Sequence, residues 1–369
     1  MHILFICKRY YMHKDLLQAY GRFYEIPAGL ARPGHRVDVV CMSYYKSRGG
    51  TSSSASSLVI SSDDATANPL ANLVNHYRRL AIRIARERPD VIVAASDCYQ
   101  IIIGATLARR FAIPLVIDVY DNFYAYRASR LPGIWPLFVR SLRYAQEISV
   151  VSSQLKQHLS EVYGLEDNVH IIENAVTSEF LSAGVKARDR AHFQFASDRI
   201  YLGTAGDLGR DGGRQTRLLI QTFVSLKKEL QNINLVLAGP VPARNLIPAH
   251  DDIQYLGQLP YAQIPALFRA MDIGIINVSD DNFGRYCFPQ KFYEMVACRL
   301  PVVASSVGEL RTLLADYPDL LFRPDDLQDM KRAILYQASQ RCALTVNVPT
   351  WQVQAEKFML IIERAIRRG

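Results

Sequence analysis

The chain has 369 residues, of which 49% are hydrophobic and 21% charged, and its formal net charge is +8. This composition argues against a disordered protein, and no uncharged apolar run reaches the roughly 18 residues that a membrane-spanning helix needs. The length predicts two domains, and the charge predicts attraction to anionic ligands or acidic surfaces.

The first half of the chain alternates predicted strands and helices. Residues 2–7 are apolar and run straight into Lys8 and Arg9, which predicts a buried strand, no secretory signal and a cytoplasmic protein. Further strands are expected at 37–42, 90–95, 114–118, 147–151 and 169–173, and helices at 22–31, 70–87 and 99–111. This alternation predicts a parallel sheet with helices on both faces. The serine-rich stretch 47–62 predicts a mobile surface loop.

Two stretches of the first half concentrate positive charge. The predicted helix 70–87 and the residue after it hold five arginines (Arg78, Arg79, Arg83, Arg86 and Arg88), and residues 126–145 mix arginines with large apolar side chains. Such a mixture suits an acidic membrane surface or a lipid-linked acceptor, and a core-packed helix with solvated arginines is the alternative. Nucleic-acid binding is not expected, because neither stretch belongs to a recognised binding module.

A second alternation follows a polar, irregular stretch at 178–198, which we interpret as a linker. Strands are expected at 200–204, 234–238, 253–256, 273–276 and 300–304, with helices at 215–230, 262–271 and 326–338. The sequence therefore predicts an α/β protein with two doubly wound domains, 1–180 and 198–350, and a last helix within 351–369. Ligands bind beyond the carboxyl ends of the strands in such sheets, so we expect a site in a cleft between the domains.

Residues 287–305, CFPQKFYEMVACRLPVVAS, predict a phosphate and diol site. A helix that begins just after Pro289 directs backbone N–H groups and the positive end of its dipole at an anion, with Gln290 in the first turn. Lys291 adds a cation in that turn, and Glu294 lies on the same face, placed to accept hydrogen bonds from hydroxyl groups. A phosphate together with a diol indicates a nucleotide, although a solvated lysine and a capping glutamate are the alternative.

The same run resembles the donor-site signature of the retaining family 4 glycosyltransferases. In that signature a glutamate, seven residues and a second glutamate precede ACGxPVVAS. Glu294 matches the second glutamate, ACRLPVVAS at 297–305 matches the tail, and FPQK at 288–291 matches a known variant. The first glutamate falls at Tyr286 and is missing. Other segments match in order along the chain, namely GHRV at 34–37, VVSS at 150–153, IIENAV at 171–176, LVLAGP at 235–240 and YLG at 255–257.

This resemblance implies the GT-B fold, two tandem Rossmann-like domains facing a central cleft, with the last helix packing back on the first domain. It implies that the loop GDLGRDGGRQTR, which begins at Gly206, and the glycine segment at Gly239 approach the donor. The arginine and lysine with which the family binds the donor phosphates do not align in that loop, so we expect Arg210 and Arg214 to replace them. In the first domain Gly21 is expected to face the donor phosphate and acceptor, with Arg22 beside it.

The resemblance departs at Tyr120, where relatives often carry a histidine that contacts the sugar; the aspartate that follows is retained as Asp121. The reaction it implies is metal-independent transfer of a hexose with retention, in which the donor phosphate takes the acceptor proton. Lys291, Arg210 or Arg214, and backbone donors near Gln290 would hold the diphosphate. Glu294 would bind the ribose, while Asp121 and Tyr120 would orient the sugar or acceptor.

The expected function is a glycosyltransferase that uses a UDP- or GDP-sugar and a glycan or lipid-linked acceptor in polysaccharide or lipopolysaccharide biosynthesis, peripheral on the inner face of the membrane. No cofactor or metal is expected, since the six cysteines form no CxxC pair and the eight histidines lack ligand spacing. Two alternatives stay open. One is another GT-B nucleotide-sugar enzyme such as an epimerase, and the other is a catalytically silent nucleotide-binding relative.

Overall fold

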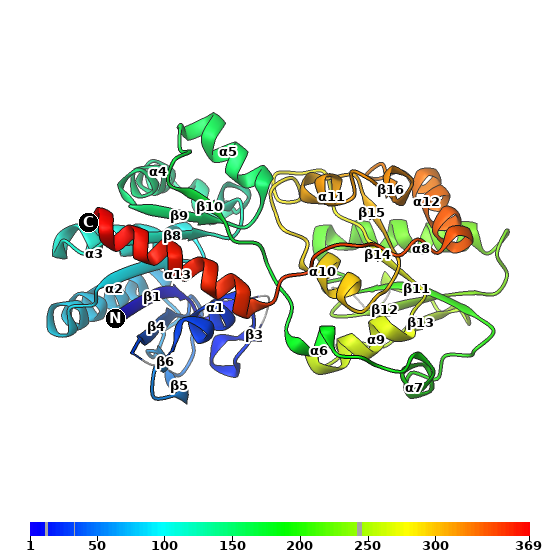
Figure 1. The fold of residues 1–369 in the computed structure, drawn as a ribbon, viewed down its shortest axis with the longest axis horizontal. Helices are drawn as coiled ribbons and strands as arrows, with labels where there is room; N and C mark the ends of the chain where they lie inside the picture. Colours follow the sequence, from blue (N-terminus) through cyan, green and yellow to red (C-terminus); the bar gives the residue numbers. More distant parts are fainter. Residues whose placement is uncertain (12–13, 33, 242–245) are drawn as a thin grey trace. The chain divides into compact units, whose positions relative to one another are not determined.

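A computed structural model describes residues 1–11, 14–32, 34–241 and 246–369 (Figure 1). The chain divides into two compact units. The first comprises Met1–Asn174, Tyr286–Phe288 and Trp351–Gly369, and the second comprises Ala175–Arg285 and Pro289–Thr350. Each unit has its own parallel sheet, as the alternation of apolar runs predicts.

The first unit is built on an eight-stranded sheet with the order β10-β9-β8-β7-β1-β4-β6-β5. Its strands are β1 (His2–Lys8), β4 (Arg36–Met42), β5 (Gly50–Ala55), β6 (Leu58–Ser62), β7 (Val91–Ala95), β8 (Leu115–Val119), β9 (Glu147–Val150) and β10 (Val169–Ile171). A small hairpin pairs β2 (Tyr10–Tyr11) with β3 (Lys14–Asp15). The central strands are largely apolar and largely buried, which is why they were predictable from the sequence.

Helices cover both faces of this sheet. They are α1 (Arg22–Leu30), α2 (Pro69–Glu87), α3 (Cys98–Phe111), α4 (Ile134–Tyr144), α5 (Ser153–Tyr163) and α13 (Trp351–Arg368). The last helix runs beside α1 in Figure 1. A Cβ at Gly29 of α1 would lie 2.4 Å from the Cβ of Ala355, so the absence of a side chain there allows the two helices to touch. The C-terminal helix is therefore part of the first unit.

The loop predicted at 47–62 is wrong in part, because most of it forms the edge of the sheet. β6 pairs in parallel with β4, and β5 pairs antiparallel with β6. Along β6 the side chains alternate between buried and half-buried, with Leu58 and Ile60 pointing into the core. The alternation of side chains that is typical of a strand was present in the sequence, but the surrounding serines suggested a loop.

The second unit has a six-stranded parallel sheet with the order β13-β12-β11-β14-β15-β16. Its strands are β11 (Ile200–Ala205), β12 (Ile233–Ala238), β13 (Ile253–Tyr255), β14 (Ile273–Ile276), β15 (Val302–Ser305) and β16 (Leu321–Phe322). Its helices are α6 (Ser178–Leu181), α7 (Lys186–His192), α8 (Arg214–Leu226), α9 (Ile264–Ala270), α10 (Gln290–Ala297), α11 (Gly308–Leu313) and α12 (Leu327–Gln340). α8 packs against α12, and α9 lies with α7 and α10.

The stretch 178–198 is not irregular, since it contains α6 and α7 within the second unit. Ion pairs hold it in place: Arg190 and Lys186 both bind Asp272, and Asp189 binds Arg269. These partners are distant in sequence, so the polar composition gave no sign of them. No helix in the described part of the chain is both long and apolar enough to cross a membrane.

Candidate functional site

The first turn of α10 is the start of the predicted phosphate site. α10 begins at Gln290, directly after Pro289, which occupies the N-cap position and whose side chain makes no capping hydrogen bond. The structure therefore confirms a helix that begins where the sequence places it. Its first backbone N–H groups have no partner within the helix, which makes this end suitable for an anion.

Lys291 and Gly206 lie against each other at the carboxyl edge of the second sheet. A Cβ at Gly206 would stand 3.2 Å from the Nζ of Lys291, so the lysine side chain passes directly over this glycine. Gly206 has φ 129°, follows β11 and donates its N–H to the carbonyl of Ala238 at 2.9 Å. The fold thus places the Lys291 ammonium beside the backbone of Gly206, where no side chain blocks the approach of a ligand.

Gly239 closes the other side of this loop. A Cβ there would lie 1.8 Å from the carbonyl oxygen of Gly206, and its φ is 137°, so only glycine fits. Its carbonyl accepts a hydrogen bond from the hydroxyl of Tyr255 at 2.8 Å, and its N–H donates to Gly257 at 2.7 Å. Three predicted donor-site residues, Gly206, Gly239 and Lys291, therefore converge where β11, β12 and α10 meet.

Glu294 lies one turn further along α10 and is almost fully buried, with 6% of its surface exposed. Its Oε1 accepts hydrogen bonds from the hydroxyl of Tyr261 at 2.8 Å and from Nε2 of Gln290 at 2.9 Å. A buried carboxylate with two donors on one oxygen is held in a fixed orientation. Gln290 thus contributes a side chain to the site, besides the backbone donor that the sequence suggested.

The two loop arginines point to different partners. The guanidinium of Arg210 lies 3.3 Å from the centre of the Phe283 ring, and Arg214 pairs with Asp325 at 3.1 Å. Arg210 is exposed, and it precedes Asp211 and Gly212, both with positive φ. The structure does not bring either arginine to Lys291, so their contact with a diphosphate stays a prediction.

In the first unit Tyr120 and Asp121 follow β8 and are buried. The Tyr120 hydroxyl accepts a hydrogen bond from Nζ of Lys8 at 3.0 Å, and its ring meets that of Phe23 edge-on at 5.1 Å. Asp121 accepts from its neighbour Asn122 at 2.8 Å and from the Tyr126 hydroxyl. Both side chains are thus fixed within the first unit.

Gly21 precedes α1 with φ 78°, a conformation that favours glycine. Arg22, which stands beside it, turns into the interior of the first unit. The residue is 1% exposed, and its guanidinium donates two hydrogen bonds to the carboxylate of Asp118, at 2.8 and 2.9 Å. This partner is 96 residues away in the sequence.

Two family models match the chain one after the other. The model described as Glycosyltransferase Family 4 matches residues 22–180, and the model described as Glycosyl transferases group 1 matches residues 199–339. Together they account for most of both units. The chain belongs to the family 4, group 1 glycosyltransferases.

Relatives and solved structures agree with this membership. The putative teichuronic acid biosynthesis glycosyltransferase TuaC of Bacillus subtilis is 21% identical over 264 residues, 70% of this chain, and the match spans 65% of that relative. Sucrose-phosphate synthase from Thermosynechococcus elongatus superposes with a TM-score of 0.74 at 17% identity over all of both chains. Anabaena Alr3699/HepE, solved with UDP-glucose, gives 0.68 at 15% identity over 100% of this chain and 99% of its own. The fold is therefore GT-B.

Tyr286 occupies the place of the family's first glutamate in this chain. Its ring centre lies 4.6 Å from that of His158, and its carbonyl accepts a hydrogen bond from the Ser152 hydroxyl at 2.7 Å. All three residues belong to the first unit. At this position the chain therefore has an aromatic packing residue and no carboxylate.

Sequence reasoning missed two polar residues, Tyr261 and Lys8. Tyr261 holds Glu294, and no motif marks it. Lys8 ends β1 and contacts Tyr120, and the sequence did contain a signal for it. A lysine at the carboxyl end of a buried parallel strand lies at the edge where ligands bind.

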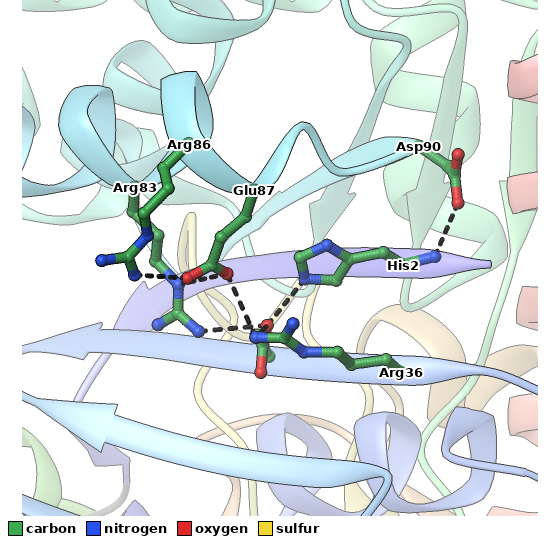
Figure 2. A network of polar contacts seen from close by, with 7 residues as sticks. His2, Arg36, Arg83, Arg86, Glu87 and Asp90 are labelled. Atoms are coloured by element: carbon green, nitrogen blue, oxygen red, sulfur yellow. Dashed lines mark hydrogen bonds and ion pairs between the residues drawn. The ribbon is translucent and has the colours of Figure 1, made fainter.

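One carboxylate and histidine cluster has the spacing of a metal site, but arginines occupy it. His2, Asp38 and Glu87 bring ligand atoms within 4.8 Å of one another. Figure 2 shows Arg36, Arg83 and Arg86 directed at the carboxylate of Glu87. Asp38 accepts from His2 at 2.6 Å, Arg36 at 2.7 Å and Arg83 at 3.0 Å. Three guanidinium groups repel a cation, so this cluster is a salt-bridge network that ties α2 to the sheet.

Proposed function

We propose that the protein is a retaining, metal-independent hexosyltransferase that moves a sugar from a UDP- or GDP-sugar to a glycan or lipid-linked glycan. The observation that carries the proposal is the contact of Lys291 with Gly206 at the start of α10. It supplies a cation, helix N–H donors and unobstructed backbone at one point, which is what a diphosphate needs. The UDP-glucose bound to the Anabaena structure supports the donor, and the teichuronic acid relative supports a polysaccharide product.

In the proposed reaction the bond between the sugar C1 and the diphosphate oxygen breaks, and an acceptor hydroxyl oxygen forms the new bond on the same face. The acceptor proton passes to the departing phosphate. Lys291 and the first N–H groups of α10 stabilise the charge that develops on that phosphate. Because these groups supply positive charge, the reaction needs no metal ion in this proposal.

The remaining predicted residues have supporting roles. Gly206 and Gly239 let the backbone approach the donor, and Arg210 or Arg214 adds a second cation. Arg210 is the better candidate, because Arg214 is already paired with Asp325. In the first unit, Asp121 and Tyr120 orient the sugar or the acceptor, and Gly21 keeps the start of α1 open to it.

We expect Glu294 to bind the ribose hydroxyls. A Glu294→Ala variant should lose most of the parent's preference for UDP over 2′-deoxy-UDP, or for GDP over its deoxy form. A hydrogen bond to a charged group contributes about 1.5–3 kcal/mol, so the preference in the parent should be about tenfold or more. Isothermal titration calorimetry measures all four affinities. The control is Tyr261→Phe, which removes a donor to Glu294 but keeps the carboxylate; an unchanged preference in Glu294→Ala would contradict the assignment.

A thermal-shift panel of UDP-, GDP- and ADP-sugars tests the function as a whole. A donor at 100 times its dissociation constant should stabilise the protein by about 2.7 kcal/mol. Incubation of the bound donor without acceptor then distinguishes a transferase from an epimerase, since only an epimerase converts the sugar. No shift with any donor would count against the proposal.

We also propose that the first unit docks on an acidic membrane surface through the segment 126–145. Large apolar side chains are exposed there, including Leu131 (56%) and Leu137 (47%). Four arginines of the segment (Arg127, Arg130, Arg140 and Arg143) are exposed, and no ion pair between described residues involves them. On α2, by contrast, Arg79, Arg83 and Arg86 are paired with carboxylates. Apolar side chains beside unpaired cations suit anionic lipid.

Replacing Arg140 and Arg143 by glutamine should weaken binding to vesicles of phosphatidylglycerol and phosphatidylcholine by about tenfold or more. Each basic residue near an anionic surface contributes about 1 kcal/mol. Co-sedimentation at fixed salt measures the effect. The control replaces Arg78 and Arg79 of α2 by glutamine, which removes the same charge elsewhere on the unit. Equal losses in the two variants would show that net charge alone, and not this segment, determines binding.

A further inference from the structure

The carboxyl edge of the first sheet carries a polar cluster at its topological switch point. β1 pairs with β4 on one side and β7 on the other, and the chain moves outward from β1 to β4 before it returns to β7. In open α/β sheets, ligands bind at the carboxyl ends of the two strands where the order reverses. Lys8 ends β1, and Ser96 and Asp97 directly follow β7. Lys8 therefore lies where the topology places a ligand.

Lys8 joins the ends of three strands. Its backbone N–H donates to the Ser96 hydroxyl at 2.7 Å, and its Nζ donates to the Tyr120 hydroxyl, beyond β8, at 3.0 Å. The carboxylates of Asp97 and Asp121 are close enough to act on its charge. Burial lowers the pKa of the Lys8 ammonium, and these two carboxylates oppose that change. The lysine is thus a partly desolvated cation, held by neighbours on β7 and β8.

The backbone around Lys8 is strained. Ser96 is fully buried and has φ 83°, a conformation that few residues other than glycine adopt. It is followed by Asp97, which caps α3 by accepting from the N–H groups of Tyr99 and Gln100 at 3.0 Å, and which also accepts from the Tyr44 hydroxyl at 3.0 Å. Strain of this kind persists where the surroundings fix it, and it concentrates at ligand sites.

The charges of the cluster favour a neutral polyhydroxyl ligand over an anion. One ammonium faces two carboxylates, those of Asp97 and Asp121, so a phosphate would meet repulsion. A sugar hydroxyl, which both donates and accepts, can bind an ammonium and a carboxylate together. The Lys8 ammonium has three N–H donors, and the Tyr120 hydroxyl accepts a hydrogen bond from one of them.

We propose that Lys8 is an acceptor-binding residue, whose ammonium donates a hydrogen bond to a hydroxyl of the saccharide acceptor at this edge of the first unit. The proposal rests on the proposed function in one respect, that the second substrate is a saccharide. Tyr120 positions the ammonium by accepting one of its hydrogen bonds.

The test uses the full chain and octyl glucosides, galactosides and mannosides as probes, with binding measured by calorimetry without donor. Lys8→Met should weaken the tightest glycoside by about tenfold or more, because a hydrogen bond from a charged donor is lost. Binding of UDP, measured separately, should change less than twofold. Lys8→Arg should recover part of the glycoside affinity, and Tyr120→Phe should lower it severalfold.

Tyr44→Phe is the matched control, because it removes a hydroxyl from the same cluster on the side of Asp97 and Gln100. It should change stability but not glycoside affinity. Parent-like glycoside binding by Lys8→Met overturns the proposal, and so does a parent that binds UDP but no glycoside. If the parent protein binds no nucleotide, only the proposed donor site is contradicted, because the glycoside titrations test the role of Lys8 independently. If Lys8→Met does not fold, Lys8→Arg and Tyr120→Phe decide the matter.

Discussion

Replacing Lys291 by methionine is expected to lower kcat by about 10²- to 10³-fold, the loss usual when one group that stabilises transition-state charge is removed. Lys291 lies over Gly206, and its Nζ would be 3.2 Å from a Cβ at that position. UDP binding should weaken less than kcat falls, since charge on the phosphate grows as the glycosidic bond breaks. Radiolabelled transfer from the donor identified by thermal shift measures kcat, and calorimetry measures UDP affinity.

Two further variants make this result specific. Lys291→Arg keeps the charge but not the compact ammonium, so it should retain a fraction of the activity. Lys228→Met removes the same charge from an exposed position of the second unit and should behave like the parent. Activity of Lys291→Met within threefold of the parent would mean that the diphosphate is neutralised by another group, and Arg210 would become the first candidate.

The elements of both sheets could be predicted because buried parallel strands are continuous apolar runs. VIVAA in β7 is an example, and all of its residues are buried. The start of α10 could be predicted because proline and the residues after it mark a helix N-terminus locally. Where a cue was local, as in these elements, the prediction is confirmed.

The contacts that define the site could not be predicted from local patterns. Gly206 and Lys291 meet through the fold, and nothing within either segment indicates the other. The same holds for Tyr261, which reaches Glu294 from 33 residues away. Family resemblance placed Gly206, Gly239 and Lys291 at one site, and the structure brings them together. It gave no role to Lys8, whose place between β4 and β7 and whose hydrogen bond to Tyr120 come from the fold.

Arg22 shows how a local cue can mislead. An arginine after a glycine at the start of a helix is a common arrangement for an anion, but here the side chain turns inward to Asp118. The carboxylate also accepts from the Ser149 hydroxyl at 2.6 Å, and the guanidinium donates to the carbonyl of Ile172 at 2.7 Å. The pair thus links α1, β8, β9 and the segment after β10 inside the first unit.

Arg22→Met is therefore expected to destabilise the first unit by about 3–5 kcal/mol, because it leaves the carboxylate of Asp118 buried and unpaired. Since both side chains of the pair are 0% exposed, water cannot replace the lost partner. For a unit of this size the unfolding transition should fall by roughly 10 °C. Calorimetry on the full chain, with and without UDP, assigns the shifted transition, because UDP should protect the second unit in both proteins.

The double variant Arg22→Met with Asp118→Leu separates an unpaired charge from a general packing defect. An apolar pair of similar volume often equals or exceeds a buried ion pair in stability, so the double variant should recover most of the loss. Asp118→Leu alone should be as damaging as Arg22→Met, because it leaves the guanidinium buried without its carboxylate. If the losses of stability in the two single variants simply add in the double variant, the broken ion pair is not their common cause. The fall in stability would then come from the lost bonds to Ile172 and Ser149.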